Sequence, residues 1–185
     1  YIEGYLVQNH DLLRRIVAVA KAKGTPICLD LASYNIVADE IAFFTELLPN
    51  VDILFANQQE AETFTGESDP EAALLKLGDI CRTVVVKTGG AGAKAKRDAE
   101  VVNVAARPVQ QVLDTTGAGD IFGGTALACV LESGKDVLEL DSAALQEIGT
   151  FASTAASLST ERSGGIASIP SREDIAARVA RLGQQ

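Results

Sequence analysis

Residues 52–64 read DILFANQQEAETF, and this stretch indicates the class of fold. Asp52–Ala56 is short, mostly apolar and compatible with a β-strand, and the composition of Gln58–Phe64 is helical. Two further runs of the same strand type are Thr25–Ala32 and Thr83–Lys87. Because apolar character in these runs is nearly continuous rather than alternating, they are typical of strands that are covered on both faces.

Helix-type segments with apolar residues at three- and four-residue spacing lie between these strands: Asp11–Lys23, Ile36–Leu48 and Pro70–Ile80. Asp69-Pro70 suits the start of the third, since proline is favoured at the first helical position. Repeated strand–helix units predict a three-layer α/β fold, with a mostly parallel, Rossmann-like sheet between helical layers. Any ligand is then expected outside the carboxyl ends of the strands.

The second half of the chain continues with fewer strands. Two short runs, Ala93–Lys96 and Glu100–Val104, are joined by Arg97-Asp98-Ala99 and predict a hairpin. QQVL at residues 110–113 predicts the end of a strand. Three helix-type stretches follow: about Ala118–Glu132, about Ala143–Leu158 and a final helix from Ser171. No linker or repeat divides the sequence, so one α/β domain over residues 1–185 is expected. Because the chain starts at Tyr1 and contains no methionine, we expect it to be part of a longer protein.

The overall composition excludes several classes of function. The 185 residues are 47 % hydrophobic and 22 % charged, and their formal net charge is −9. No cluster of Lys and Arg offers a surface for phosphodiester backbones, which disfavours nucleic-acid binding. No apolar run approaches the ~20 residues that cross a bilayer, and no signal peptide opens the chain. We therefore expect a cytoplasmic protein that does not bind membranes.

Cysteine and histidine offer little chemistry. Cys28, Cys81 and Cys129 are far apart in apolar contexts, which favours buried free thiols over disulfides or a metal site. His10 is the only histidine, and it lies near the start of a predicted helix, far in sequence from every glycine-rich segment. A surface or capping role is expected for it.

The strongest chemical signal is Asp114–Asp120, which reads DTTGAGD directly before a helix-type stretch. Its small residues allow a ligand to approach the backbone closely, and the start of a helix directs several unpaired N–H groups at one point. Such a turn holds an anion, above all a transferring phosphoryl group, and Asp120 beside it could orient a hydroxyl and accept its proton. The alternative is a tight turn at Gly117 and Gly119, with Asp114 or Thr116 only capping the helix.

Two other segments follow predicted strands. Lys87–Gly92 reads KTGGAG and could wrap nucleotide phosphates, although it matches neither a Walker loop nor a complete dinucleotide fingerprint, and it could equally be a plain connection. Asn57–Glu60 reads NQQE and fits a capping box, with Asn57 as the N-cap; its functional interpretation places Asn57 and Glu60 near phosphates and Mg²⁺. The polar loop Ser163–Ser168 could bind a ligand or a monovalent cation, or merely connect two helices.

Taken in order, these segments resemble the ribokinase-like, or PfkB, family of carbohydrate and nucleoside kinases. Asn57–Glu60 is similar to the family's Asn-x-x-Glu motif, Lys87–Gly92 to its glycine turn, and Asp114–Asp120 to its Asp-Thr-x-Gly-Ala-Gly-Asp signature. YIEGYL at residues 1–6 and DLASY at residues 30–34 resemble bacterial adenosine kinase-like members slightly more than they resemble ribokinase itself. The family's N-terminal portion, with the sugar site and the lid, is absent from this sequence, so the acceptor cannot be inferred and this chain alone could be inactive.

The resemblance implies ATP-dependent phosphorylation of a hydroxyl on a sugar, sugar acid or nucleoside. It makes Asp120 the base, and Gly117, Ala118 and Gly119 the anion hole. It places Asn57 and Glu60 at phosphate and Mg²⁺, with Glu60 acting through water. Along ATP it places Lys87, Gly89, Gly92 and Ser153, the last at the adenine. A K⁺ or related ion would be held by Asp114, Thr116, Ser159, Arg162, Gly164 and Ser168, several of them through main-chain carbonyls.

Three classes of function remain open from sequence. The first is the kinase, which forms a homodimer in some family members. The second is a catalytically silent nucleotide-binding or interaction module that keeps the same turn. The third is a nicotinamide-dependent oxidoreductase on a similar sheet, which the incomplete dinucleotide fingerprint disfavours.

Overall fold

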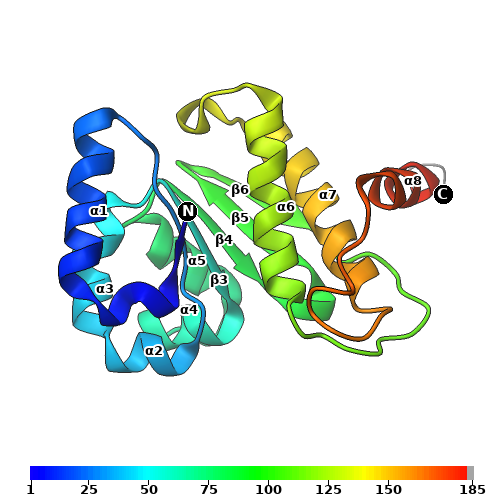
Figure 1. Ribbon diagram of the computed structural model, residues 1–185, viewed down its shortest axis with the longest axis horizontal. Coiled ribbons are helices and arrows are strands. Elements are labelled where there is room, and N and C mark those ends of the chain that lie inside the picture. The colour runs from blue at the N-terminus through cyan, green and yellow to red at the C-terminus, as the bar shows by residue number, and fades with distance from the viewer. Residues whose placement is uncertain (183–185) are drawn as a thin grey trace. The chain divides into compact units, whose positions relative to one another are not determined.

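The computed structural model describes residues 1–182, and its strands form one six-stranded sheet (Figure 1). The strands follow each other in the sheet in chain order: β1 (Ile2–Glu3), β2 (Cys28–Asp30), β3 (Ile53–Asn57), β4 (Thr83–Lys87), β5 (Ala93–Arg97) and β6 (Glu100–Val104). β1 to β4 are parallel neighbours, while β5 and β6 are joined by a two-residue turn. The predicted α/β class with a mostly parallel sheet is confirmed.

The helices alternate with the parallel strands and then follow the hairpin. They are α1 (His10–Lys23), α2 (Tyr34–Asp39), α3 (Ile41–Leu47), α4 (Gln58–Thr65), α5 (Pro70–Gly78), α6 (Ala118–Ser133), α7 (Ser142–Ser159) and α8 (Arg172–Leu182). Single turns of 3₁₀ helix lie at Gly4–Gln8, Leu48–Asn50, Gly89–Ala91 and Val137–Glu139. No helix within residues 1–182 is both long and apolar enough to cross a membrane.

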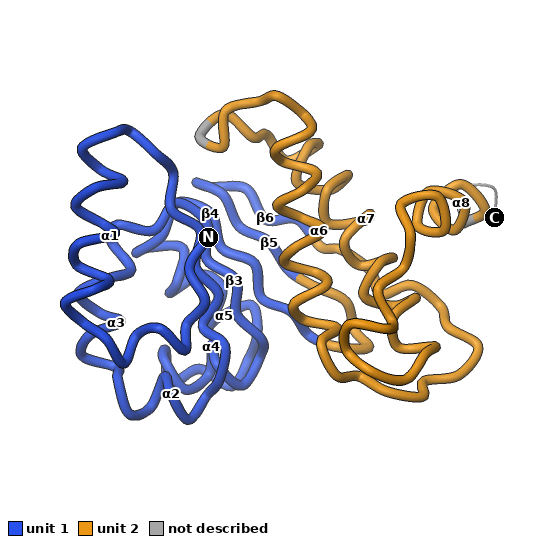
Figure 2. The backbone as a smooth tube through the Cα atoms, in the orientation of Figure 1, with its two compact units in different colours: residues 1–88, 94–102 blue, residues 89–93, 103–185 orange. Residues whose placement is uncertain are grey.

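The chain divides into two compact units, coloured separately in Figure 2. Unit 1 comprises residues 1–88 and 94–102, and unit 2 comprises residues 89–93 and 103–185. Unit 1 therefore contains β1 to β4, most of the hairpin and α1 to α5, while unit 2 contains α6, α7 and α8. The expectation of a single domain stays a prediction.

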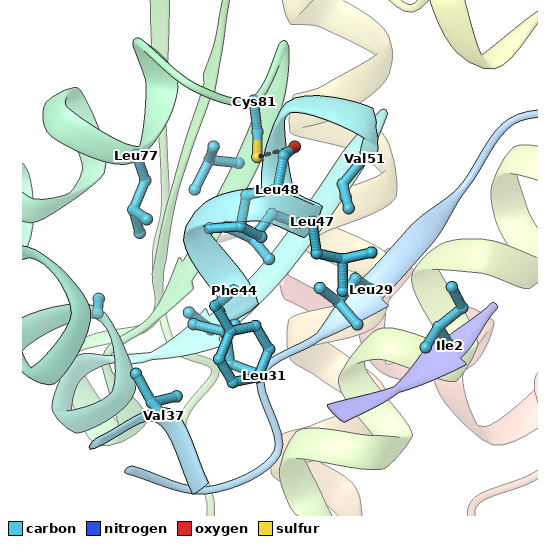
Figure 3. Packing of buried hydrophobic residues seen from close by; sticks show 14 of the residues in the cluster. Ile2, Leu29, Leu31, Val37, Phe44, Leu47, Leu48, Val51, Leu77 and Cys81 are labelled. Atoms are coloured by element: carbon cyan, nitrogen blue, oxygen red, sulfur yellow. Dashed lines mark hydrogen bonds between the residues drawn. The ribbon is translucent and has the colours of Figure 1, made fainter. Parts of the chain in front are cut away.

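The core of unit 1 explains why its strands are continuous apolar runs. The first four residues of both β3 and β4 are buried, as are all three of β2. Side chains from the helices and connections complete this core, among them Val37, Phe44, Leu48 and Leu77 (Figure 3). The thiol of Cys81 donates a hydrogen bond to the Leu48 carbonyl at 3.2 Å, and Cys28 is also buried. All three cysteines were expected to be buried free thiols; this is confirmed for Cys28 and Cys81, whereas Cys129 is free but only partly buried, so its expected burial is wrong.

The register of the parallel strands places their carboxyl ends together. Asp30, the last residue of β2, pairs with Phe55, and Asn57, the last residue of β3, pairs with Lys87, the last of β4. Polar side chains therefore begin where the buried apolar part of each strand ends. This edge of the sheet is the place at which a parallel α/β fold positions a ligand site.

Several expected boundaries are confirmed and two are wrong. Asp69 caps α5, with Pro70 in its first turn, and the hairpin lies where it was predicted. The single helix expected over Ile36–Leu48 is instead divided at Glu40, whose φ of −116° and ψ of 22° leave the helical region. Periodicity could not reveal this break, because the apolar spacing continues through it.

The strand end predicted at residues 110–113 is also wrong, since this segment forms neither helix nor strand. The Gln110 N–H binds the side chain of Glu161 and the Leu113 N–H binds the Thr160 carbonyl, so these groups do not enter a sheet. Val112 and Leu113 are both 55 % exposed, whereas a strand of this sheet would bury them. The apolar residues Val112 and Leu113 therefore lie in a loop, although their local composition predicts a strand.

Candidate active site

Asn57 and Glu60 form a complete capping box at the start of α4. The Asn57 side-chain oxygen accepts from the Glu60 N–H at 2.9 Å, and the Glu60 carboxylate accepts from the Asn57 N–H at 2.7 Å. The Asn57 side-chain amide also donates to the other Glu60 carboxylate oxygen at 2.5 Å. The expected N-cap is confirmed, and both carboxylate oxygens of Glu60 have a protein donor.

Glu60 is an acid held inside the protein, with only 2 % of its surface exposed. The pKa of Glu60 is raised above its ordinary value, mainly by burial, although the Asn57 N–H and the positive charge of Lys87 partly lower it. Each carboxylate oxygen carries two lone pairs, so both oxygens can accept a second donor. The residue therefore suits a contact through water better than direct ligation of a metal.

Lys87 lies beside this box and forms an ion pair with Asp30. The distance from Lys87 Nζ to Asp30 Oδ2 is 2.7 Å, and the two side chains are 13 % and 4 % exposed. The other Asp30 oxygen accepts from the Ala32 N–H at 3.1 Å. Lys87 therefore balances two buried acids, Asp30 and Glu60.

Asp30 was missed as a site residue by sequence reasoning. Its only signal is that a charged residue ends the apolar run of β2, at the same edge of the sheet as Asn57 and Lys87. We name Asp30, Asn57, Glu60 and Lys87 the strand-end cluster. It lies wholly within unit 1.

The glycine turn after β4 contains two different kinds of glycine. Gly92 has φ 101°, and a Cβ there would lie 2.0 Å from the Val104 carbonyl oxygen, so the backbones approach too closely for any side chain. Gly89 has φ 58°, but a Cβ there would meet nothing within 4 Å. Both glycines have a positive φ that disfavours other residues, but only at Gly92 is there also no room for a side chain.

The turn Asp114–Asp120 starts α6, and we name it the catalytic turn after the role that the resemblance implies for it. Gly117 is the N-cap residue with φ 75°, and the Ala118 N–H donates to the Thr115 carbonyl at 3.2 Å. Asp120 stands in the first turn of the helix and is exposed. The first turn of a helix offers N–H groups without helical partners and the positive end of the helix dipole, which together favour an anion.

Asp114 ties the catalytic turn to a distant loop. One carboxylate oxygen accepts from the Thr116 N–H and the other from the Gly164 N–H, both at 2.9 Å. These hydrogen bonds, the one from Gly164 foremost, lower the pKa of Asp114 to about 2. A Cβ at Gly117 would lie 3.4 Å from the Gly165 Cα, so the loop also packs closely on the turn.

The remaining predicted residues of unit 2 lie on α7 and this loop. Ser168 is 2 % exposed; its N–H donates to the Gly164 carbonyl at 2.9 Å and its hydroxyl to the Gly165 carbonyl at 3.0 Å. Ser159 is 1 % exposed and donates to the Ala156 carbonyl at 2.8 Å. The Arg162 side chain lies outside, 3.8 Å from Asp174.

Ser153 lies on α7 and is 5 % exposed. Its hydroxyl donates to the Ala105 carbonyl at 3.1 Å, which ties α7 to the chain after β6. This contact gives the residue a structural role in the folded chain. Its expected place at the adenine stays a prediction.

The structure thus brings the predicted residues together in two groups. Unit 1 joins Asn57, Glu60 and Lys87, and unit 2 joins Asp114, Thr116, Gly117 and Gly164. No cluster of three or more His, Cys, Asp or Glu side chains suited to a metal occurs within residues 1–182. His10 is not part of the group in unit 1: it begins α1, stacks on Phe43 and binds Glu40.

Comparison with known families decides the affiliation of the chain. A model of the pfkB family of carbohydrate kinases matches residues 1–172, which include both groups of residues. The chain belongs to the pfkB family. The resemblance drawn from the three motifs is therefore confirmed, and the catalytic turn lies within the matched region.

Similar proteins include several pfkB kinases. The ribokinase of Arabidopsis thaliana is 32 % identical over 170 residues, covering 87 % of this chain and 41 % of the relative. The ribokinase of Haemophilus influenzae is 30 % identical over 162 residues, covering 84 % and 48 %. This chain therefore spans less than half the length of these two relatives.

Solved structures show the same correspondence. A probable sugar kinase of Rhizobium etli has a TM-score of 0.82 at 27 % identity, covering 97 % of this chain and 53 % of that one. The adenosine kinase of Sinorhizobium meliloti has a TM-score of 0.77 at 30 % identity, covering 98 % and 53 %. The second match is compatible with the lean towards bacterial adenosine kinase-like members.

Proposed function

We propose that the protein containing this chain is an ATP-dependent kinase that transfers the γ-phosphate to a hydroxyl of a small sugar. The observation that carries this proposal is the catalytic turn, in which Gly117 starts α6 at φ 75° and places the exposed Asp120 in its first turn. An anion site beside a carboxylate is the pair of groups that phosphoryl transfer to an alcohol requires.

In this mechanism Asp120 orients the acceptor hydroxyl and receives its proton. The acceptor oxygen forms a bond to the γ-phosphorus while the bond from that phosphorus to the oxygen bridging to the β-phosphate breaks, so that ADP leaves. The N–H groups of Gly117, Ala118 and Gly119 would hold the charge on the migrating phosphoryl oxygens, and the Ala118 N–H would then share its hydrogen between the phosphoryl group and the Thr115 carbonyl, to which it donates at 3.2 Å. Because the transition state is loose, little proton removal is needed before the phosphoryl group moves, and a carboxylate is a sufficient base.

The strand-end cluster would serve the nucleotide. Mg²⁺, when bound, would neutralise phosphate charge, and Glu60 would contact it through water, since both Glu60 oxygens already accept protein donors. Asn57 keeps that carboxylate in place. Lys87 would add positive charge for ATP while it remains paired with Asp30, and the backbone at Gly89 and Gly92 would lie along the nucleotide, with Ser153 near the adenine.

A monovalent cation is proposed beside the anion hole. Asp114 stays ionised at all ordinary pH values, since its pKa is about 2, and oxygen atoms of Thr116, Gly164 and Ser168 lie in the loops that it joins. Hard oxygen ligands of this kind suit K⁺ or a similar ion. The hydroxyl of Ser159 and the backbone of Arg162 complete the proposed set.

The acceptor is proposed from the relatives. Two are named ribokinase, one solved relative was crystallised with ribose and ATP, and another is an adenosine kinase. We therefore place a sugar first, with a sugar acid or nucleoside as the further acceptors to test. The complete protein would act without nucleic acid or membrane, and a homodimer is the proposed assembly.

The test is ATP consumption by the full-length protein against a panel of sugars, sugar acids and nucleosides, with and without K⁺. We expect one acceptor class to stimulate turnover and K⁺ to increase it. ATP binding with no stimulated turnover on any acceptor would reject the kinase and favour a silent nucleotide-binding module. Turnover that is unchanged by K⁺ would reject only the proposed cation site.

A further inference from the structure

The segment between β6 and α6 leads directly into the catalytic turn without regular structure of its own. Residues 105–115 form neither helix nor strand. Such a segment has no ladder of local hydrogen bonds, so its position depends on contacts with other parts of the chain. The position of the catalytic turn depends on the same contacts, because its first residue, Asp114, lies within this segment.

Two residues far along the chain provide these contacts. The Glu161 carboxylate accepts from the Gln110 N–H at 3.1 Å through one oxygen and from the Arg178 guanidinium at 3.1 Å through the other. Arg178 uses its second terminal nitrogen to donate to the Pro108 carbonyl at 3.0 Å. The Glu161 and Arg178 side chains are only 22 % and 24 % exposed, so this is not a fully solvated surface pair.

The same anchor continues into the catalytic turn. Glu161 follows Thr160, whose carbonyl accepts from the N–H groups of Leu113 at 2.7 Å and Asp114 at 3.3 Å. Asp114 in turn binds the N–H groups of Thr116 and Gly164. A continuous series of contacts thus runs from α8 through Glu161 to the start of α6, all within unit 2.

We propose that Glu161 and Arg178 form a positioning clasp that sets the catalytic turn for phosphoryl transfer. This proposal rests on the proposed function for its kinetic consequence, but its structural part does not. Glu161 is the positioning residue, since it accepts the Gln110 N–H, and Arg178 holds the Glu161 carboxylate in the required orientation. Neither residue contacts the reacting atoms in this mechanism; both act through the backbone that carries Asp114–Asp120.

The first experiment compares Glu161→Ala with wild type in the full-length protein. We expect kcat to fall by about 10- to 100-fold, because a displacement of about 1 Å at a reacting group can cost a hundredfold in rate. We expect KM for ATP to stay within about threefold, because the clasp does not touch the nucleotide-binding residues. If Glu161→Ala does not fold, Glu161→Gln, which keeps an acceptor oxygen at the same length, replaces it, with a smaller loss expected.

A matched control breaks another ion pair of α8. Arg172 pairs with Glu132 at the far end of α6, and these side chains are 59 % and 50 % exposed. Glu132 lies twelve residues beyond Asp120, about 18 Å along the helix axis. Glu132→Ala should leave kcat at the wild-type value. An equal loss in this variant would overturn the proposal, because attachment of α8 in general would then be the cause.

A charge swap separates positioning from simple stabilisation. In the double variant Glu161→Arg with Arg178→Glu, the ion pair can re-form, but the Gln110 N–H then faces a guanidinium, which has donors only. We expect Tm to return towards wild type while kcat stays low. Recovery of kcat with Tm would overturn the proposal.

Hydrogen exchange gives a readout that needs no activity. In Glu161→Ala the amides of Gln110 and Leu113 should exchange faster than in wild type, and in Glu132→Ala they should not. Unchanged exchange at both amides would overturn the clasp. If wild type phosphorylates no acceptor, the proposed function fails on its own, and hydrogen exchange still decides whether the clasp exists.

Discussion

The strand-end cluster and the catalytic turn are both polar sites, but they are built in opposite ways. In the cluster, Glu60 and Asp30 are 2 % and 3 % exposed, and each carboxylate has protein partners. In the turn, Asp120 is exposed, and the groups that hold the turn are mainly backbone N–H groups and carbonyls of a distant loop. The acids of the cluster are therefore buried, whereas the acid of the turn, Asp120, is exposed to solvent.

This difference separates stability from chemistry. Buried charged groups that are paired cost much free energy when one partner is removed, whereas exposed residues contribute little to folding. Mutations in the cluster should therefore lower the free energy of unfolding. Mutation of the exposed Asp120 in the catalytic turn should change turnover at nearly constant stability.

The largest expected effect is on turnover, from Asp120→Asn in the full-length protein. The amide cannot accept the acceptor proton, so kcat should fall by about 10²- to 10⁴-fold, the range for loss of a general base. ATP binding should be near normal, and the free energy of unfolding should fall by less than about 1 kcal/mol, because the position is exposed and only the interaction of the carboxylate with the helix N-terminus is lost. Steady-state kinetics, ATP titration and chemical denaturation measure the three quantities; unchanged turnover would reject Asp120 as the base.

The converse is expected for Lys87→Ala, which leaves Asp30 without its ion-pair partner and removes the positive charge near Glu60. Breaking a buried pair costs about 3–5 kcal/mol, and the 13 % exposure of Lys87 places this pair at the lower end of that range. The control is Lys76→Ala, which breaks the exposed pair with Glu67 and should cost less than about 1 kcal/mol. Urea denaturation of both variants measures the two losses in the free energy of unfolding. Equal losses would mean that the Lys87–Asp30 pair contributes no more to stability than an exposed ion pair.

The same difference explains what could be predicted from sequence. The capping box at Asn57 and Glu60 is visible because its partners are three residues apart, and the strands are visible because burial on both faces makes them apolar throughout. The Asp30–Lys87 pair is not visible, because it joins β2 to β4 across β3 and depends on the register of three strands. Local patterns describe local contacts.

The catalytic turn adds a second lesson. Its composition and its order among the motifs indicate phosphate chemistry, and the family resemblance groups Asp114 with Gly164, whose N–H donates to the Asp114 carboxylate at 2.9 Å. The anchors of residues 108–113 were missed, and a strand end was predicted instead. Nothing in the local sequence shows that Glu161, 51 residues later, accepts the Gln110 N–H.

A smaller effect is expected at the glycine turn that connects β4 to β5. Gly92→Ala forces a Cβ against the Val104 carbonyl at φ 101°, and overpacking with backbone strain of this kind costs about 2 kcal/mol. Gly90→Ala, where a Cβ meets nothing within 4 Å, should change the free energy of unfolding by less than about 0.5 kcal/mol. Thermal or urea unfolding of both variants tests the difference, and a Gly90→Ala variant as unstable as Gly92→Ala would show that the turn as a whole is intolerant.

The smallest expected effect is the response of Asp114 to acid. Its pKa is lowered from 3.8 to about 2 in the folded protein, so the ionised form contributes stability that is complete above pH 3.8 and is lost as pH falls through about 2. An NMR titration should follow the Asp114 carboxyl carbon and the Gly164 amide with one midpoint near pH 2. Asp114→Asn is the control: it cannot ionise, and its amide nitrogen is a donor facing one of the two N–H groups, so the Gly164 midpoint should disappear. A midpoint near the ordinary value of 3.8 would mean that the loop does not hold the carboxylate in solution, and the cation site proposed around Asp114 would lose its fixed ligand.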